Sequence, residues 1–134
     1  MCLMPPMAKI LIADDSRFQV QLVSTYLAPR GFAVISAGDA LQTWMTALRQ
    51  PPEAIVLDIS MPGGTGIEVL KRLRMSDTTR HIPVVVVSGS SDPNIEGTVK
   101  ELRAHDFLHK PVDPSRLCDT LSSLLEPPAP SESR

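Results

Sequence analysis

Short hydrophobic runs alternate along this chain with longer stretches in which hydrophobic and polar positions are mixed. The runs cover residues 10–12, 32–35, 54–57, 84–87 and 107–108. They contain several β-branched residues and little polar alternation, a pattern typical of strands that are buried on both faces of a sheet. The chain is therefore predicted to contain five short, buried strands.

The stretches between the runs have the spacing of amphipathic helices. The first helix is predicted to end at Gly31, because glycine commonly follows the last turn of a helix. The hydrophobic face predicted for this helix consists of Phe18, Leu22, Val23, Tyr26 and Leu27.

The third and the last helical stretches have equally clear faces. In the third, hydrophobic residues at positions 67, 70 and 73 predict an inner face, with Lys71, Arg72 and Arg74 pointing outward. In the last, leucines at positions 117, 121, 124 and 125 form the hydrophobic stripe, and Asp113 and Pro114 suit a cap and a first turn. Residues 39–49 and 94–103 fill the two remaining helix positions less clearly.

Five strands that alternate with five helices favour a parallel sheet with helices on both faces. The predicted fold is a doubly wound, flavodoxin-like α/β sandwich with strand order 2-1-3-4-5. The 134 residues suffice for one such domain, which is predicted to span residues 8–125. Residues 1–7 are interpreted as an N-terminal extension, and the Pro- and Ser-rich residues 126–134 as a disordered tail or linker.

Composition and charge narrow the classes of function. A net charge of −2 gives no electrostatic basis for direct binding to nucleic acid or to an anionic membrane. No hydrophobic run is long enough to predict a membrane span, and no signal peptide is recognised at the start. Cys2 and Cys118 match no metal-binding or redox spacing, so a reduced, cytoplasmic location is expected.

Polar residues follow the predicted strands at the edge where the fold would place a ligand site. In open parallel sheets that site lies beyond the carboxyl ends of the strands, where the strand order reverses. Asp14 and Asp15 follow the first strand, Asp58 the third, Ser88 the fourth and Lys110 the fifth. Three carboxylates, a hydroxyl and an ammonium group are therefore predicted to converge.

Three neighbouring carboxylates repel one another, and a divalent cation would relieve that repulsion. A cluster of oxygen ligands with access to water suits Mg²⁺. Lys110 and Ser88 add donors for phosphoryl oxygens. A carboxylate nucleophile, a metal and two donors are the requirements of in-line phosphoryl transfer, so transfer of a phosphoryl group onto one carboxylate is predicted.

From residue 8 to residue 125 the sequence resembles the receiver domains of bacterial two-component response regulators, the CheY-like proteins. Four motifs support the resemblance: ILIADDS, LDISMPGGTGIEVL, VVVVSG and FLHKP. They occur in order at the ends of the predicted strands, with Ser88 30 residues after Asp58 and Lys110 22 residues after Ser88. The set is far more specific than any one motif.

The resemblance implies that Asp58 accepts a phosphoryl group from the phosphohistidine of a sensor kinase or phosphotransfer protein. It also implies that Asp15, Asp58 and the backbone carbonyl of Ser60 bind Mg²⁺, with Asp14 acting through a bound water. A downstream protein or a linked output domain would read the signal. Met61-Pro62 and Gly66 match the loop that shapes the site.

The resemblance further implies a conformational switch. Lys110 would contact the phosphoryl group or an acidic partner, Ser88 would move toward it, and Phe107 would fill the space left behind. A cis peptide bond is implied between Lys110 and Pro111. The sequence departs from the common pattern in having Ser88 for Thr, Phe107 for Tyr, and Arg103-Ala104 where the family often has Gly-Ala.

Other interpretations of these residues remain open. Asp14, Asp15 or Ser16 would also suit the cap of the first helix, and Ser88 beside a glycine would also suit a turn. Phe107 fits a core aromatic as well as a switch residue.

Two other functions are considered. One is a receiver-fold interaction module that works without phosphorylation. The other is an aspartyl-phosphate hydrolase of the haloacid dehalogenase type, which would place its acids two residues apart after the first strand; here they are adjacent.

Overall fold

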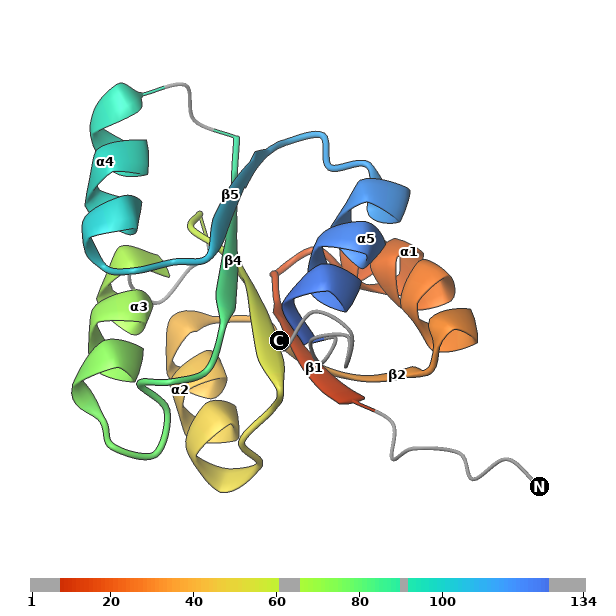
Figure 1. Ribbon diagram of the computed structural model, residues 1–134, viewed down its shortest axis with the longest axis horizontal. Coiled ribbons are helices and arrows are strands. Elements are labelled where there is room, and N and C mark those ends of the chain that lie inside the picture. The colour runs from red at the N-terminus through yellow and green to blue at the C-terminus, as the bar shows by residue number, and fades with distance from the viewer. Residues whose placement is uncertain (1–7, 61–65, 90–91, 126–134) are drawn as a thin grey trace, which may run out of the picture.

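The computed structural model describes residues 8–60, 66–89 and 92–125, which form a parallel five-stranded sheet between two layers of helices (Figure 1). The predicted N-terminal extension, the predicted tail and the Met61-Pro62 pair lie outside the described residues. The strands are β1 (Ala8–Ala13), β2 (Phe32–Ala37), β3 (Ala54–Asp58), β4 (Val84–Ser88) and β5 (Asp106–His109). Their order is β2-β1-β3-β4-β5, which confirms the predicted topology.

Among the described residues, four α-helices and one short 3-10 helix connect the strands, and a fifth α-helix follows β5. They are α1 (Arg17–Leu27), η1 (Ala28–Arg30), α2 (Ala40–Arg49), α3 (Gly66–Met75), α4 (Pro93–Glu101) and α5 (Pro114–Leu125). Helices α1 and α5 cover one face of the sheet, and α2, α3 and α4 cover the other (Figure 1). Among the described residues no helix is long and apolar enough to span a membrane.

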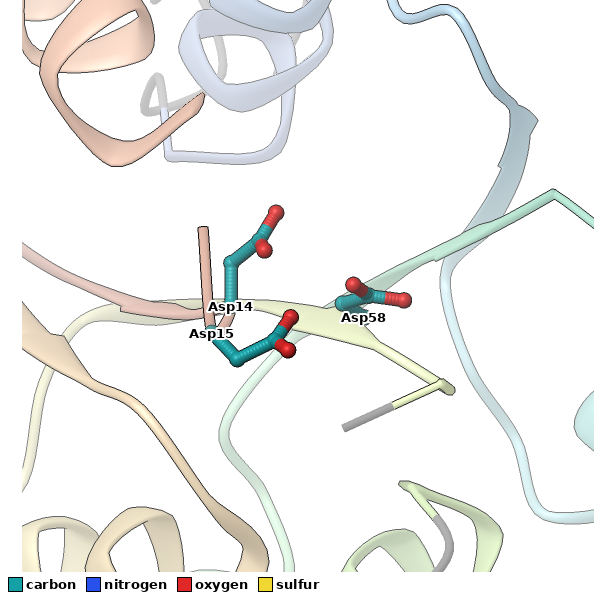
Figure 2. Close-up of side chains that lie close together, drawn as sticks. All are labelled: Asp14, Asp15 and Asp58. Carbon is teal, nitrogen blue, oxygen red and sulfur yellow. The ribbon is translucent and has the colours of Figure 1, made fainter. Parts of the chain in front are cut away.

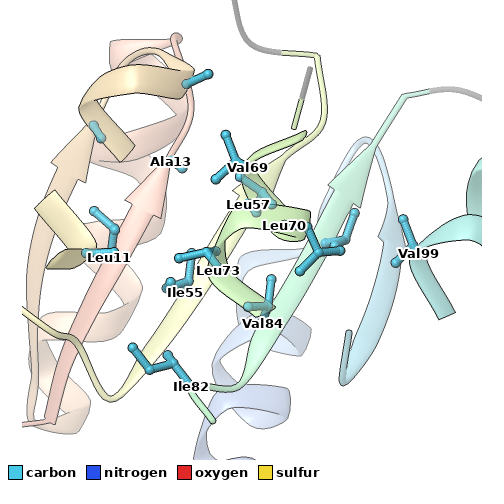
Figure 3. Packing of buried hydrophobic residues seen from close by; sticks show 14 residues of the cluster. Leu11, Ala13, Ile55, Leu57, Val69, Leu70, Leu73, Ile82, Val84 and Val99 are labelled. Atoms are coloured by element: carbon cyan, nitrogen blue, oxygen red, sulfur yellow. The ribbon is translucent and has the colours of Figure 1, made fainter. Parts of the chain in front are cut away.

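Alternate residues of each strand point to opposite faces of the sheet and build two cores. Leu11, Ile55 and Val84 pack with α2, α3 and α4 (Figure 3), whereas Ile10 and Val85 pack with α1 and α5. Strands β3 and β4 are buried at every position, as expected for the centre of a parallel sheet. Their continuous hydrophobic runs are explained by this burial on both sides.

Side-chain caps fix where the helices begin. Ser16 caps α1 by accepting a hydrogen bond from the N–H of Gln19 (3.2 Å), and Asp39 caps α2. Asp113 precedes Pro114 and accepts a bond from the N–H group two residues on, as the sequence predicted for α5. After η1, Gly31 has a φ of 92°, a left-handed conformation that favours glycine.

The hydrophobic face predicted for α1 is partly wrong. Phe18 and Tyr26 are 75% and 45% exposed, whereas Val23 and Leu27 are buried and Val20 packs beside them. Each residue advances a helix by about 100°, so Phe18 lies almost opposite Val20. The helix has hydrophobic residues on two sides, and the sequence alone did not show which side meets α5.

The outward orientation predicted for the basic residues of α3 is right for Lys71 and Arg72 and wrong for Arg74. The Arg74 side chain is buried, with 9% of the residue exposed. Its guanidinium group supplies donors to carbonyl groups near the end of α4 and before β4, which explains the burial of a charged residue. These hydrogen bonds are to the carbonyl oxygens of Leu102 (3.0 Å), Arg80 (3.1 Å), Ile82 (2.9 Å) and Arg103 (3.0 Å).

Candidate functional site

Three carboxylates meet at the carboxyl ends of β1 and β3 (Figure 2). In the sheet register Ala13 of β1 pairs with Leu57 of β3, so the residues that follow them lie side by side. One carboxylate oxygen from each of Asp14, Asp15 and Asp58 lies within 4.8 Å of the other two. The predicted convergence of these acids is therefore observed.

Asp58 is the most enclosed of the three, with 2% of the residue exposed. Its Oδ1 accepts a hydrogen bond from the backbone N–H of Ser60 at 2.9 Å. Its Oδ2 accepts one from Nζ of Lys110 at 2.8 Å. Lys110 is anchored in turn, because its N–H donates to the carbonyl oxygen of Ser88 (2.9 Å). Residues from three strand ends thus fix the position of one carboxylate.

Burial raises the pKa of Asp14 above its usual value, and the negative charges of Asp58 and Asp15 raise it further. A hydrogen bond from the N–H of Ser16 to Asp14 Oδ1 (2.9 Å) and the charge of Lys110 oppose this effect only in part. The negative charge of the carboxylate cluster is therefore only partly compensated.

Burial by itself would lower the pKa of Lys110. The hydrogen bond to Asp58 and the charges of Asp58, Asp14 and Asp15 outweigh burial and raise that pKa above its usual value. Lys110 is consequently held as a cation beside Asp58, where it also can meet another anionic group.

The donor set fits a divalent cation. Three carboxylates face one ammonium group, so the cluster keeps an excess of negative charge that a cation with oxygen ligands would neutralise. Asp15 is exposed, and an opening of about 510 Å³ beside the cluster is lined by Asp14, Asp15 and Arg17, which gives access from solvent. Arg17 is a basic neighbour of the cluster that was not predicted from the sequence. Its place directly after Asp14-Asp15-Ser16 could have indicated that it lies near the acids.

The structure bears on the capping interpretation of the adjacent acids. Ser16 caps α1, so neither Asp14 nor Asp15 is used as the N-cap of that helix. Asp14 does accept a hydrogen bond from Ser16, but its second oxygen and the whole carboxylate of Asp15 are not needed for that turn. Helix capping therefore does not account for the acidic pair.

Ser88 is buried at the end of β4, next to the strand that contains Asp58. Phe107 is partly buried in β5 and packs against the core under α2, α3 and α4. Its ring meets the ring of His109 edge to face, with centroids 5.0 Å apart. Both residues lie where the sequence predicted them, and their movement remains a prediction.

Two backbone features shape the site. The Lys110–Pro111 peptide bond is cis, as predicted. At Gly66, the first residue of α3, a Cβ atom would come within 2.6 Å of Cα of Ile59. The N–H of Gly66 also donates to the carbonyl oxygen of Ile59 (3.0 Å). Only glycine allows α3 to approach the backbone that follows Asp58 this closely.

Comparison with known proteins identifies relatives of this chain. The sequence profile named response regulator receiver domain matches residues 10–122. The response regulator PleD of Caulobacter vibrioides is 38% identical over 120 residues, which cover 87% of this chain and 26% of PleD. The chain thus spans about a quarter of the length of that relative.

Solved structures agree with the sequence comparison. The chemotaxis response regulator CheY4 of Vibrio cholerae is 32% identical, with a TM-score of 0.82, covering 89% of this chain and 99% of that one. The phosphorylated cyanobacterial phytochrome response regulator RcpA is 26% identical, with a TM-score of 0.74, covering 89% of this chain and 91% of that one.

Proposed function

Since the chain belongs to the response regulator receiver domain family, we propose that it is a phosphorylation switch whose acceptor is Asp58. The observation that supports this most directly is the environment of Asp58: a buried carboxylate held by Ser60 and Lys110 and faced by Asp14 and Asp15. A structural role alone would not explain the placing of three acids together at a sheet edge. RcpA, a structural relative, is described as phosphorylated.

The reaction proposed is the transfer of a phosphoryl group from a phosphohistidine to Asp58. A carboxylate oxygen of Asp58 forms a bond to phosphorus as the bond from phosphorus to the imidazole nitrogen breaks, and the imidazole leaves with the electron pair. Lys110 compensates the charge of the phosphoryl oxygens, and the Ser88 hydroxyl donates to one of them. The protein therefore contributes orientation and electrostatic stabilisation.

The residues that would hold Mg²⁺ are Asp15, Asp58 and the backbone carbonyl of Ser60, with Asp14 acting through a water. When bound, the ion would neutralise charge on the carboxylates and on the incoming phosphoryl oxygens. Asp14 and Asp15 would keep the ion beside Asp58, and Lys110 would remain close enough to pair with the product. The proposal rests on the all-oxygen donor set and on its excess of negative charge.

Phosphorylation would shift the protein between two states. The acyl phosphate offers new acceptors to Lys110 and Ser88, and a modification changes a conformational balance only through such differential contacts. Movement of Ser88 would open space for Phe107, which packs against residues near α4, and would alter the surface of α4, β5 and α5. The partners proposed are a sensor histidine kinase or phosphotransfer protein upstream, and a target protein or linked output domain downstream.

Intact-mass spectrometry after incubation with acetyl phosphate and Mg²⁺ tests the proposal. The expected result is one phosphate adduct that is absent from Asp58→Asn and absent when EDTA replaces the metal. Asp119→Asn, which removes an exposed carboxylate on α5, should be labelled like the wild type and controls for net charge. An adduct that persists in Asp58→Asn would refute the assignment, and no adduct at all would favour the interaction module.

A further inference from the structure

Basic side chains surround a depression at the edge of the sheet opposite the carboxylates. His81 precedes β4 and His105 precedes β5, so the depression lies at the amino ends of these two strands. It has a volume of about 630 Å³, and none of the described residues that line it is acidic. Those lining residues are Arg74, Arg80, His81, Arg103, Ala104 and His105.

Arg74 is the buried member of this basic pocket, held in place by its bonds to carbonyl groups. Within residues 8–60, 66–89 and 92–125, no carboxylate forms an ion pair with Arg74 or with Arg103. Burial lowers the pKa of Arg74, and the positive charge of Arg103 lowers it further. The pKa of His105 is lowered by burial and by Arg74. Arg74 and Arg103 therefore repel each other, and neither forms an ion pair with a carboxylate among the described residues.

Arg103 occupies a backbone conformation that glycine would adopt more easily. Its φ is 63°, in the left-handed region, where L residues with a side chain are strained. Its N–H donates to the carbonyl oxygen of Lys100 (2.9 Å), so the residue closes the end of α4. A glycine would serve that purpose without strain, whereas arginine adds a guanidinium group to the pocket. Strain kept at one position is an indication of function.

Among the described residues, the carboxylate that forms an ion pair with a basic residue of the pocket is held weakly. Asp77 Oδ1 lies 3.7 Å from Nη1 of Arg80, and both side chains are largely exposed. Exposed pairs of this kind contribute little. Arg80 is therefore able to exchange Asp77 for another anion.

We propose that the basic pocket binds a diphosphate group, either as inorganic pyrophosphate or as part of a nucleoside diphosphate. The guanidinium groups of Arg80 and Arg103 can match phosphate oxygens with two parallel hydrogen bonds, and the imidazoles supply further donors. Arg74, most of whose N–H groups bond carbonyl oxygens, contributes its charge. A volume of about 630 Å³ is within the usual range of small-molecule sites and exceeds the need of one phosphate. Several cationic side chains at separate positions match an anion whose negative charge is spread over two phosphate groups. This site is distinct from the carboxylate cluster and does not depend on phosphorylation.

Titration of the ¹⁵N-labelled chain with sodium pyrophosphate, followed by amide NMR, tests the proposal. EDTA is present throughout, so that no metal recruits the anion to Asp58. We expect saturable shifts centred on His81, Ala104 and His105, with the amides of Asp14 to Ser16 unmoved. A second titration with ADP distinguishes the sources: tighter binding than pyrophosphate indicates a nucleotide, and equal binding indicates the diphosphate alone.

Arg103→Gly removes the guanidinium group and relieves the backbone strain, so the variant should fold at least as well as the wild type. Its affinity for pyrophosphate should fall about tenfold or more, which is the effect of losing a charge-assisted hydrogen bond. Arg80→Gln gives a second test on an exposed side chain. Arg49→Gln is the matched control, since Arg49 is exposed at the end of α2 and does not line the pocket.

Three results would overturn the proposal. One is a titration that never saturates, and another is a set of shifts that centres on the carboxylate cluster. The third is an Arg103→Gly protein that binds pyrophosphate as tightly as Arg49→Gln does, although its urea unfolding midpoint shows that it is folded.

Discussion

Asp14→Asn should make the metal-free protein more stable. Asparagine keeps the oxygen that accepts a hydrogen bond from Ser16 and removes one of three crowded negative charges. Two unit charges at 4.8 Å, the upper limit of the oxygen separations here, repel by about 1 kcal/mol in water and by about 3.5 kcal/mol at an effective dielectric constant near 20. Lys110 offsets part of this repulsion. We therefore expect the free energy of unfolding to rise by about 1–2 kcal/mol.

The pH dependence of this gain follows from the raised pKa of Asp14. A carboxyl group with a higher pKa in the folded chain binds protons more tightly when folded, so acidification stabilises the fold through that group. The advantage of Asp14→Asn should therefore be largest near neutral pH. It should shrink as the pH falls through the raised pKa and vanish below the ordinary pKa of 3.8, where Asp14 is protonated in both states.

Urea unfolding in EDTA, at several pH values, measures the effect. Mg²⁺ should stabilise the wild type and should stabilise Asp14→Asn less, because the variant has a weaker donor set. Asp119→Asn is the control: its carboxylate pairs with Arg30 on the surface, so its loss should lower stability by less than about 1 kcal/mol. An Asp14→Asn protein that is no more stable than the wild type near neutral pH would refute the reasoning.

Four further predictions concern two glycines and two basic side chains. Gly66→Ala should lower the free energy of unfolding by about 3 kcal/mol, since its Cβ would lie 2.6 Å from a backbone Cα atom. Gly97→Ala, in α4 with nothing within 4 Å, should raise it by about 0.5–1 kcal/mol, and urea midpoints compare the two. Arg74→Met should cost about 3 kcal/mol by leaving carbonyl groups unpaired, as judged by urea unfolding; a cost below about 0.5 kcal/mol would contradict this. For Lys110, whose pKa is raised, the stabilisation from its pairing with Asp58 should be complete below the ordinary lysine pKa of 10.5 and be lost as the pH rises through the raised pKa. Lys110→Met should not show this loss.

The sheet was predictable because its local and its long-range signals agree. The valine run of β4 and the run of β3 are too short and too uniformly hydrophobic for anything but buried strands, and both are buried throughout. Alternation with helices then restricts the topology to a doubly wound sheet. The observed order is the one predicted.

Side-chain orientation on the helices was less predictable. Helix α1 has hydrophobic residues on two sides, so its pattern does not tell Phe18, which is exposed, from Val20, which packs in the core. Arg74 has the charge of an outward residue, but its spacing of four from Leu70 and seven from Ile67 places it on the inner face of α3. Its burial also depends on the carbonyl groups of Leu102 and Arg103, which lie 28 and 29 residues further along the chain, and the sequence of α3 does not show these partners.

The candidate site was predictable to the extent that topology fixes it. Once the strand order is known, the ends of β1, β3 and β5 place Asp14, Asp58 and Lys110 together. The basic side chains that gather at the other end of the strands were not predictable in the same way. The basic pocket at the opposite edge depends on Arg103, whose residue type does not indicate its left-handed backbone conformation; the resemblance, in which glycine is frequent at this position, was the available signal.

The identity of the phosphoryl acceptor is tested by peptide mapping after borohydride reduction. Borohydride reduces an acyl phosphate and converts the modified aspartate to homoserine. After incubation with acetyl phosphate and Mg²⁺, we predict that the conversion occurs at Asp58 and leaves Asp14 and Asp15 as aspartate. Conversion at Asp14 or Asp15, or a phosphate-labelled protein with Asp58 unreduced, would contradict the central claim.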